Sequence, residues 1–313
     1  MNILNKVSEM SGIPQDMCAK FIISAPMRYK RYEIPKRNGS GTRLIAQPSK
    51  IVKPLQKICI DQLRKTLPIH SAALAYEVGT SIKKNANKHR YNRYLLKMDF
   101  TNFFPSIKPD VLLRTFEEHG LVITEEDKFV LSSLLFWKPR RRAPNLELSI
   151  GAPSSPFISN AVMYFFDVAV TEHCSNRGIV YTRYADDLTF STNIADTLFE
   201  IPNFLYDLVQ QTNMSFLRFN TDKTVFASKK VNRHITGVTI TNDGRLSLGR
   251  KRKRKISAMI HRFSLQQLRS NDEINELKGI LGFAKHIEPI FVRRMCDKYG
   301  KDTIVKIQKF NSD

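Results

Sequence analysis

The sequence has little of what membrane spans, disulfide frameworks or zinc sites are built from. No stretch of about 18 consecutive apolar residues occurs in the chain, so we expect no membrane-spanning helix. It contains four cysteines, none of them in a C-x-x-C pair, and this favours buried free thiols over disulfides or a zinc site. The first 13 residues mix polar with apolar side chains, so we predict a short amphipathic helix there and no signal peptide.

Acidic residues are scarce beside basic ones. Fifty Lys and Arg residues against 29 Asp and Glu residues give the 313-residue chain a net charge of +21. Solubility needs a much smaller charge, and self-repulsion on this scale opposes a compact fold. We therefore predict a polyanionic partner, most often a nucleic acid.

The predicted elements run in the order of a mixed first part, a β-rich middle and a helical tail, with no internal repeat. Apolar residues at helical spacing predict helices over residues 1–30, 51–66, 109–119, 125–136, 157–170, 198–213 and beyond 249. Runs of β-forming residues predict strands over residues 32–35, 42–46, 94–100, 179–184, 188–191, 234–241 and 245–248. Turn residues at 39–41 and 242–244 predict two hairpins.

Three aspartates stand where predicted strands end or turn. Asp99 closes a compact apolar run, and Asp186 with Asp187 lies between two β-rich runs. Adjacent carboxylates repel each other unless a cation compensates them. With Asp99 they supply the hard oxygen ligands that two Mg²⁺ ions require, spaced roughly 3.5–4 Å apart in two-metal enzymes. A simple turn cap is the alternative, but the β-forming flanks favour a metal-dependent nucleotidyl transfer site.

Further blocks surround these acids in a fixed order. They read Arg43 with Gln47-Pro48, Asn85-Ala86-Asn87-Lys88-His89, Asp99-Phe100-Thr101-Asn102-Phe103-Phe104-Pro105-Ser106, Gly151-Ala152-Pro153-Ser154-Ser155-Pro156 with Ser159-Asn160, Tyr184-Ala185-Asp186-Asp187, Asn220 with Lys223-Thr224, and Ile235-Thr236-Gly237. In these blocks and their order the chain resembles reverse transcriptases, and most closely the retron reverse transcriptases. The match runs from about residue 30 to residue 250, and the helical tail matches only in position and character.

The resemblance implies an α+β fold of the right-hand polymerase type. The fingers would comprise residues 1–93 with part of 107–150, the palm residues 94–248 with an antiparallel sheet flanked by helices, and the helical thumb residues 249–313. It implies an RNA-directed DNA polymerase that copies a dedicated non-coding RNA into short, RNA-linked single-stranded DNA (msDNA). Such enzymes prime from an internal 2′-hydroxyl of that RNA and belong to bacterial, cytoplasmic anti-phage systems with a separate effector protein.

The resemblance also implies roles for particular residues. The two Mg²⁺ ions would lie at Asp99, Phe100, Asp186 and Asp187, with Lys223 as a candidate general acid for the leaving pyrophosphate. The dNTP site would comprise Lys36, Arg43, Phe104, Ile150 and Gly151, with Phe104 as the steric gate beneath the sugar 2′ position. The RNA would contact Asn85, His89, Thr236 and Gly237, and the charge of the basic run in the tail adds Arg250, Arg252 and Arg254 as candidate RNA contacts.

Several of these roles have plainer alternatives. Lys223 could be a solvated or phosphate-contacting lysine, and His89 a structural histidine. The basic run from Arg250 to Lys255 is on a helix more often a solvated face, although beside an apolar stripe it suits a helix that presents cations to an RNA stem. One departure matters: Ile150 stands where the family usually has Gln, and Ile cannot hydrogen-bond near the incoming nucleotide.

Alternative functions also stay open at this point. One is a bacterial reverse transcriptase of the abortive-infection or intron type, and another is a catalytically silent RNA-binding protein. The intact acids argue against the silent protein. Ala185 and Phe104 argue against an RNA-dependent RNA polymerase.

Overall fold

A computed structural model describes residues 2–36, 41–268 and 270–310 of the chain. The chain divides into two compact units, which are described separately below. The first unit comprises residues 1–79, 98–188 and 199–224, and the second comprises residues 80–97, 189–198 and 225–313. The division into fingers, palm and thumb stays a prediction. Most of the predicted turn at residues 39–41 lies outside the described residues.

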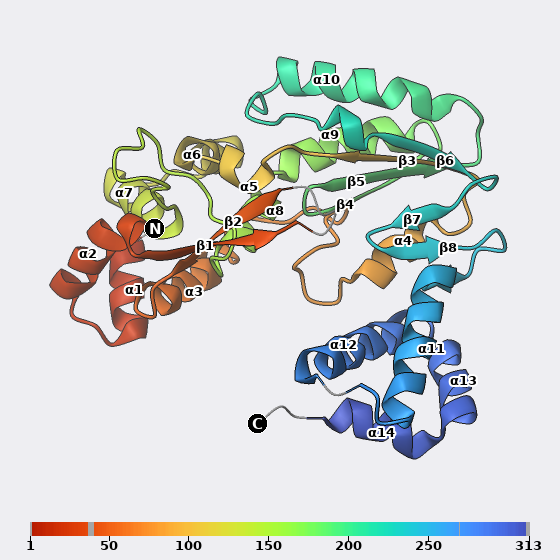
Figure 1. Ribbon diagram of the computed structural model, residues 1–313. Helices are drawn as coiled ribbons and strands as arrows, with labels where there is room; N and C mark the ends of the chain where they lie inside the picture. The colour runs from red at the N-terminus through yellow and green to blue at the C-terminus, as the bar shows by residue number, and fades with distance from the viewer. Residues whose placement is uncertain (1, 37–40, 269, 311–313) are drawn as a thin grey trace. The chain divides into compact units, whose positions relative to one another are not determined.

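The first unit begins with helices that pack on one another (Figure 1). They are α1 (Ile3–Ser11), α2 (Gln15–Ser24), the short 3-10 helix η1 (Ala25–Met27), α3 (Val52–Leu63), α6 (Pro109–Glu118) and α7 (Glu125–Leu135). The start of α1 is fixed to α7, because the backbone N–H of Ile3 donates to the Asp127 carboxylate at 2.8 Å. The segment predicted as one helix over residues 1–30 instead forms α1, α2 and η1, and a strand begins at Tyr29.

An antiparallel hairpin follows α1, α2 and η1 in the chain. Strand β1 (Tyr29–Pro35) pairs with β2 (Thr42–Pro48) from Tyr29 opposite Pro48 to Pro35 opposite Thr42. β1 is almost wholly exposed, whereas β2 buries Ile45 and Ala46. The backbone N–H of Ala46 donates to the carbonyl of Ile150 at 2.9 Å, so the segment around residue 150 docks on this hairpin.

The predicted helix over residues 157–170 is broken in the structure. It consists of α8 (Ser155–Ala161) and α9 (Tyr164–Ser175). No Gly or Pro marks the break in the sequence. The Met163 N–H bonds to the carbonyl of Asn160, three residues back, at 3.3 Å, and this tighter turn ends one helix and redirects the chain into the next.

A four-stranded sheet has the strand order β4-β5-β3-β6. Its strands are β4 (Val180–Tyr184), β5 (Asp187–Thr192), β3 (Tyr94–Asp99) and β6 (Val225–Ser228). β3 and β6 are antiparallel, with Tyr94 opposite Ser228 and Lys97 opposite Val225. Four further helical elements precede β6 in the chain, namely α5 (Phe103–Ser106), η2 (Thr197–Glu200), α10 (Ile201–Gln211) and η3 (Thr221–Lys223).

The second unit combines a small sheet with helices. Its sheet has the order β7-β8-β9, formed by β7 (Arg233–Ile235), β8 (Val238–Ile240) and β9 (Leu246–Ser247). Its helices are α4 (Ile82–His89), α11 (Arg250–Ser264), α12 (Asn271–Ile287), α13 (Pro289–Tyr299) and α14 (Lys301–Lys309), and the last four gather into one group (Figure 1). Their shared core includes Ile256, Met259 and Ile260, which recur at helical spacing along α11.

The predicted strand over residues 234–241 is two strands joined by a two-residue loop. Thr236 and Gly237 both have positive φ, 46° and 83°, between paired Ile235 and Val238. Such a loop matches the right-handed twist of a hairpin, and glycine supplies the left-handed conformation without strain. The hairpin predicted around residues 242–244 is confirmed, because β8 pairs antiparallel with β9.

Two predictions from composition can be compared with the structure. The four cysteines are free thiols, and Cys18, Cys59 and Cys174 are buried. Across the described ranges, no helix combines the length and apolar character needed to cross a bilayer.

Candidate active site

The turn between β4 and β5 carries Asp186. Ala185 adopts a left-handed backbone conformation, with φ of 57°, which is uncommon for a residue with a Cβ atom. The buried guanidinium of Arg183 fixes this turn, because its Nη1 donates to the carbonyl oxygen of Ala185 at 3.2 Å. The strained backbone is therefore fixed by a side chain from the preceding strand.

Arg183 is itself clamped by a buried carboxylate. Its Nη2 lies 2.6 Å from Oδ2 of Asp167, and its Nε lies 2.9 Å from Oδ1. Tyr181 donates its hydroxyl to the same Oδ1 at 2.8 Å, and Asn160 accepts from Arg183 Nη1 at 3.1 Å. Burial alone would lower the pKa of Arg183, but Asp167 more than offsets this and raises it. A buried ion pair with its hydrogen bonds satisfied in this way can persist without water.

Asp99 lies beside this turn at the end of β3. The N–H of Phe100 donates to the carbonyl of Asp186 at 3.2 Å, which joins the two segments directly. The carbonyl of Asp99 accepts from the N–H of Asn220 at 2.8 Å, and the Thr101 N–H donates to the carbonyl of Arg218 at 2.7 Å. Backbone hydrogen bonds from both sides therefore place the Asp99 carboxylate near Asp186.

The electrostatics of the three acids favour a bound cation. Burial, followed by the charge of Asp99, raises the pKa of Asp186. Burial, followed by the charges of Asp186 and Asp99, raises the pKa of Asp187 to about 7. Such mutual repulsion is relieved when a divalent ion is shared, and carboxylate oxygens are its preferred ligands. The donor chemistry therefore fits the predicted metal site.

The side-chain arrangement itself is not that of ready-made metal ligands. Within residues 2–36, 41–268 and 270–310, no three His, Cys, Asp or Glu side chains group closely enough to hold an ion. Instead, the Lys223 ammonium lies 2.9 Å and 3.1 Å from the two oxygens of Asp99. Its side chain is 54% exposed, so this contact is open to competition by solvent ions. Lys223 and a metal ion would compete for Asp99.

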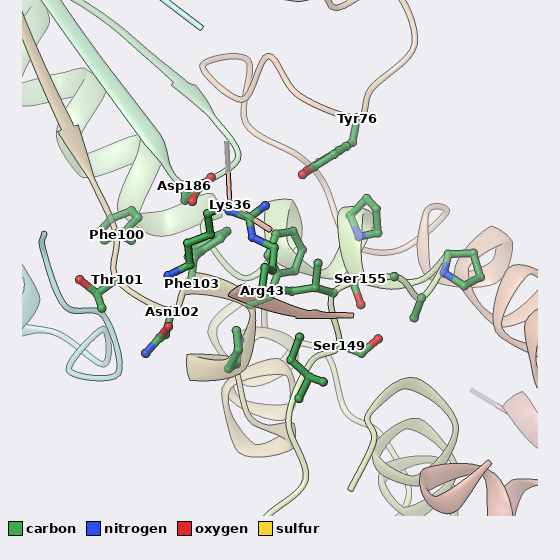
Figure 2. A pocket seen from close by; sticks show the side chains of 18 of the residues that line it. Lys36, Arg43, Tyr76, Phe100, Thr101, Asn102, Phe103, Ser149, Ser155 and Asp186 are labelled. Carbon is green, nitrogen blue, oxygen red and sulfur yellow. The ribbon is translucent and has the colours of Figure 1, made fainter. Parts of the chain in front are cut away.

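A pocket of about 1490 Å³ opens in front of these acids, within the first unit. Its lining includes most of the residues predicted for catalysis and nucleotide binding, namely Lys36, Arg43, Asp99, Phe100, Phe104, Ile150, Gly151, Asp186 and Lys223. Figure 2 shows Lys36, Arg43 and Asp186 around it. Asp187 is absent from this lining, although it couples electrostatically to both other acids.

Gly151 is required by close packing at the pocket wall. Its φ is +124°, and a Cβ atom there would lie 3.0 Å from Ile45 and 3.1 Å from the carbonyl oxygen of Ala46. The neighbouring Ile150 carbonyl accepts from Ala46, so the two segments run in direct contact. Any larger residue at 151 would separate the hairpin from the pocket wall.

Sequence reasoning missed several pocket residues. Lys50, just before α3, and Lys53 and Lys57 on α3 line it, and Tyr76 lines it from a loop. The three lysines had a signal, because they recur at helical spacing opposite the buried Val52 and Leu55. Tyr76 had none, because its exposure depends on the loop conformation.

Two residues predicted to contact RNA lie inside the second unit. Asn85 is 0% exposed and His89 is 1% exposed. Nδ1 of His89 lies 2.7 Å from the Ser191 hydroxyl, and burial lowers the His89 pKa to about 3, with a smaller contribution from Lys88. Their burial favours the structural alternative over direct RNA contact.

The basic run on α11 divides into anchored and exposed residues. Arg252 donates to the carbonyl of Gly237 at 2.8 Å and stacks on Phe283 with its guanidinium carbon 4.6 Å from the ring centre. Lys253 pairs with Glu288 at 2.6 Å, and Lys255 pairs with Glu276. Arg250 and Arg254 are exposed one helical turn apart. Within the described part of the chain no ion pair engages either of them.

Comparison with known proteins gives the family and the fold of the chain. A family model described as "Reverse transcriptase (RNA-dependent DNA polymerase)" matches residues 34–240. An apo telomerase from Candida tropicalis has a similar fold, with a TM-score of 0.52 and 12% identity over 92% of this chain and 60% of the telomerase chain.

Curated relatives narrow the class further. The chain is 44% identical to the retron Ec83 reverse transcriptase of Escherichia coli over 90% of each protein. It is 28% identical to the retron Ec86 reverse transcriptase of the same organism, over 98% of this chain and 93% of that protein. The chain therefore belongs to the reverse transcriptase family and, within it, groups with the retron enzymes. It is an RNA-directed DNA polymerase that uses dNTPs and, as the family does, divalent metal ions.

Proposed function

We propose that this enzyme copies one structured non-coding RNA into short single-stranded DNA that stays linked to that RNA, as part of an anti-phage system. The observation that carries the proposal is the 44% identity to a retron reverse transcriptase over nine tenths of both chains. The proposal includes a separate effector protein and action in the bacterial cytoplasm. Free cysteines are consistent with that reducing compartment.

In this proposal Asp99, Asp186 and Asp187 hold two Mg²⁺ ions. The chemistry that such ions supply is activation of the attacking hydroxyl and neutralisation of charge on the leaving pyrophosphate. Lys36 and Arg43 line the same pocket and bind the triphosphate, and Arg43 offers the fork geometry that matches phosphate. Lys223 is exposed enough to leave Asp99 and give a proton to the pyrophosphate.

Phe104 would select the sugar. It lines the pocket, half-buried, with its ring edge-on to Phe103 at a centroid distance of 5.6 Å. A bulky ring beneath the 2′ position leaves room for a deoxyribose and excludes a ribose hydroxyl. Phe103 is in turn stacked on Phe100 at 5.6 Å, so the gate rests on a rigid aromatic base.

Recognition of the cognate RNA would use the exposed cations of the second unit. Arg250 and Arg254 share one face of α11, where they can contact phosphates of an RNA stem. Duplex RNA hides its base edges in a deep, narrow groove, so shape, phosphates and loop bases must supply selectivity. This binding would hold the priming 2′-hydroxyl near Asp99 and Asp186.

The proposal is tested by the RNA that copurifies with the protein. Sequencing should return one structured RNA encoded beside the enzyme's gene, and adding dNTPs and Mg²⁺ without a primer should extend DNA covalently from it. Branched linkage predicts that the product resists alkali at one internal nucleotide and is released by a debranching enzyme. A mixed RNA population, together with extension only from added primers, would instead indicate a reverse transcriptase of another type.

A further inference from the structure

One exposed aromatic side chain in the pocket has a backbone conformation that aromatic residues rarely adopt. Tyr76 has a φ of 69° and is 46% exposed, yet it lines the pocket together with Asp186 and Arg43. Left-handed backbone at a bulky residue persists only where the surroundings impose it, and such positions cluster at functional sites.

The residues before Tyr76 are hydrogen-bonded to β4. The N–H of Arg183 donates to the carbonyl of Ala72, and the N–H of Leu74 donates to the carbonyl of Arg183, both at 2.8 Å. The side-chain amide of Asn160 then donates to the carbonyl of Ala75 at 2.8 Å. Because Asn160 also accepts from Arg183, the network beneath the catalytic turn extends to the residue that precedes Tyr76.

The residue after Tyr76 is held as well. Glu77 accepts from Arg64 at 2.7 Å, and the Arg64 guanidinium carbon lies 4.6 Å from the centre of the Phe157 ring. Tyr76 is therefore presented from a short loop that is anchored on both sides.

The side chain points into the pocket toward functional groups. Its ring meets the Phe104 ring nearly edge-on, at a centroid distance of 6.5 Å and an interplanar angle of 66°. Figure 2 shows its hydroxyl directed to the side where Lys36 and Asp186 lie. Burial and then the charge of Asp186 raise the pKa of Tyr76 to about 12, so the side chain is neutral when the enzyme works.

We propose that Tyr76 is a specificity-determining positioning residue for the nucleotide sugar: its ring supports Phe104 from the pocket side and so fixes the ring that meets the 2′ position. The Phe104 ring packs edge-on against the rings of both Phe103 and Tyr76, so loss of Tyr76 removes one of the two aromatic contacts that hold it. This inference rests on the role of Phe104 in the proposed function. The hydroxyl of Tyr76 is not needed for the support.

The test measures the ratio of kcat/KM for a dNTP to that for the matching rNTP on an annealed primer. Tyr76→Gly removes the ring and also relieves the backbone, so misfolding cannot explain its effect if the Tm is kept or raised. The ratio should fall about 2- to 10-fold, the range that one edge-to-face ring contact supports. Tyr76→Phe should keep the wild-type ratio, and Val78→Ala, an exposed change in the same loop, serves as the matched control.

A double-mutant cycle separates support of Phe104 from independent contact with the nucleotide. In a Phe104→Val background, Tyr76→Gly should leave the ratio unchanged, because there is no ring left to support. An unchanged ratio in Tyr76→Gly, an equal fall in Tyr76→Phe, or full additivity with Phe104→Val would each overturn the inference. Self-primed synthesis on the copurified RNA is measured separately with the wild type, so failure of the proposed function is distinguishable from failure of this inference.

Discussion

Arg183 in the first unit and Arg233 in the second are both buried, and the two units hold them in opposite ways. Arg183 is 0% exposed and is clamped by the Asp167 carboxylate, which raises its pKa. Arg233 is 1% exposed and, among the residues that the structure describes, its hydrogen bonds go to the backbone carbonyls of Asn92 and Thr241, so burial lowers its pKa.

The difference follows from what each unit positions. The first unit must hold a strained turn in one place, and a buried ion pair is sensitive to small displacements of either partner. The second unit needs only to join a small sheet to its neighbouring segments, for which neutral acceptors suffice. A buried charge of the first unit, Arg183, therefore holds the turn that carries Asp186, whereas Arg250 and Arg254 of the second unit are exposed.

The largest expected effect separates chemistry in the first unit from binding in the second. Asp186→Asn and Asp99→Asn should each reduce metal-dependent DNA synthesis by about 10³-fold or more, because removal of a ligand forfeits several kcal/mol of charge stabilisation. RNA affinity should stay nearly unchanged. Primer extension and filter binding measure the two quantities. Asp222→Asn, an aspartate in the same pocket lining, is the control, and normal extension by either site variant would contradict the assignment.

The two buried arginines can be compared directly by substitution. Arg183→Met strands the Asp167 charge in the core and should cost about 3–5 kcal/mol in the free energy of unfolding. Arg233→Met strands only carbonyl acceptors and should cost about 1–3 kcal/mol. Urea unfolding of both variants gives the values.

A paired replacement sharpens the same comparison. Arg183→Met with Asp167→Leu should recover most of the stability while activity stays low, because the Ala185 carbonyl then has no donor from position 183. Full activity in this double variant would show that the ion pair serves folding alone.

The exposed and anchored arginines of α11 should respond differently to neutralisation. Arg250→Gln with Arg254→Gln should flatten the salt dependence of RNA binding by about one unit of log–log slope for each phosphate that the variant no longer binds, with little change in Tm. Arg252→Gln should lower the Tm instead, because the wild-type side chain bonds to the Gly237 carbonyl and stacks on the Phe283 ring.

A comparison of two priming reactions tests whether these arginines select the cognate RNA. Extension of a generic annealed primer by the Arg250→Gln, Arg254→Gln variant should survive far better than self-primed synthesis on the cognate RNA. If Arg252→Gln flattens the salt dependence as strongly as the pair does, the division of α11 into anchored and exposed cations is wrong.

The buried histidine of the second unit predicts a loss of stability in acid. The folded-state pKa of His89 is about 3, below an unfolded value near 6.5, so the unfolded chain binds the extra proton between these values. Its contribution is complete above about pH 6.5 and is lost as pH falls toward 3, by up to about 1.4 kcal/mol per pH unit.

Replacement of His89 isolates this contribution from the other titrating groups. The groups around it include Lys88, Ser191 and Asn92, which donates to the same Ser191 hydroxyl. His89→Gln should be less stable at pH 7 but show a flatter pH dependence of the unfolding free energy between about pH 6.5 and 4. Parallel curves for the two proteins would show that His89 does not titrate in this way.

Local patterns in the sequence predicted much of the fold, and failed where distant segments decide. A compact apolar run placed β3, and apolar residues at helical spacing placed α3, within a few residues of their bounds. The break between α8 and α9 had no Gly or Pro to mark it. The clamp of Arg183 by Asp167 joins a helix to a strand 16 residues away, which only the folded chain brings together.

The residues of the candidate site likewise fall into those that local sequence predicts and those that depend on distant segments. Asp99, Asp186 and Asp187 stand in short motifs whose chemistry is readable without coordinates. Tyr76 was not predicted, because its left-handed backbone is imposed by anchors from Asn160 and Arg64. The burial of His89 and the docking of Arg252 likewise depend on neighbours that sequence spacing does not reveal.

The smallest expected effect concerns Ile150, where the family resemblance leads us to expect Gln. Ile150 lines the pocket, and its carbonyl is held by the Ala46 N–H at 2.9 Å, so a new side chain at 150 extends from a fixed backbone. Ile150→Gln adds an amide near the incoming nucleotide, and one such hydrogen bond contributes about 0.5–1.5 kcal/mol. The KM for dNTPs should therefore change about 2- to 10-fold, while RNA affinity, which we propose draws on the second unit, should stay the same. Ile150→Leu keeps an apolar side chain of the same volume and is the control. Equal dNTP KM values for the Gln variant and the wild type would place residue 150 outside the nucleotide site. A matching change in RNA affinity would contradict the expectation that nucleotide binding depends on the first unit and RNA binding on the second.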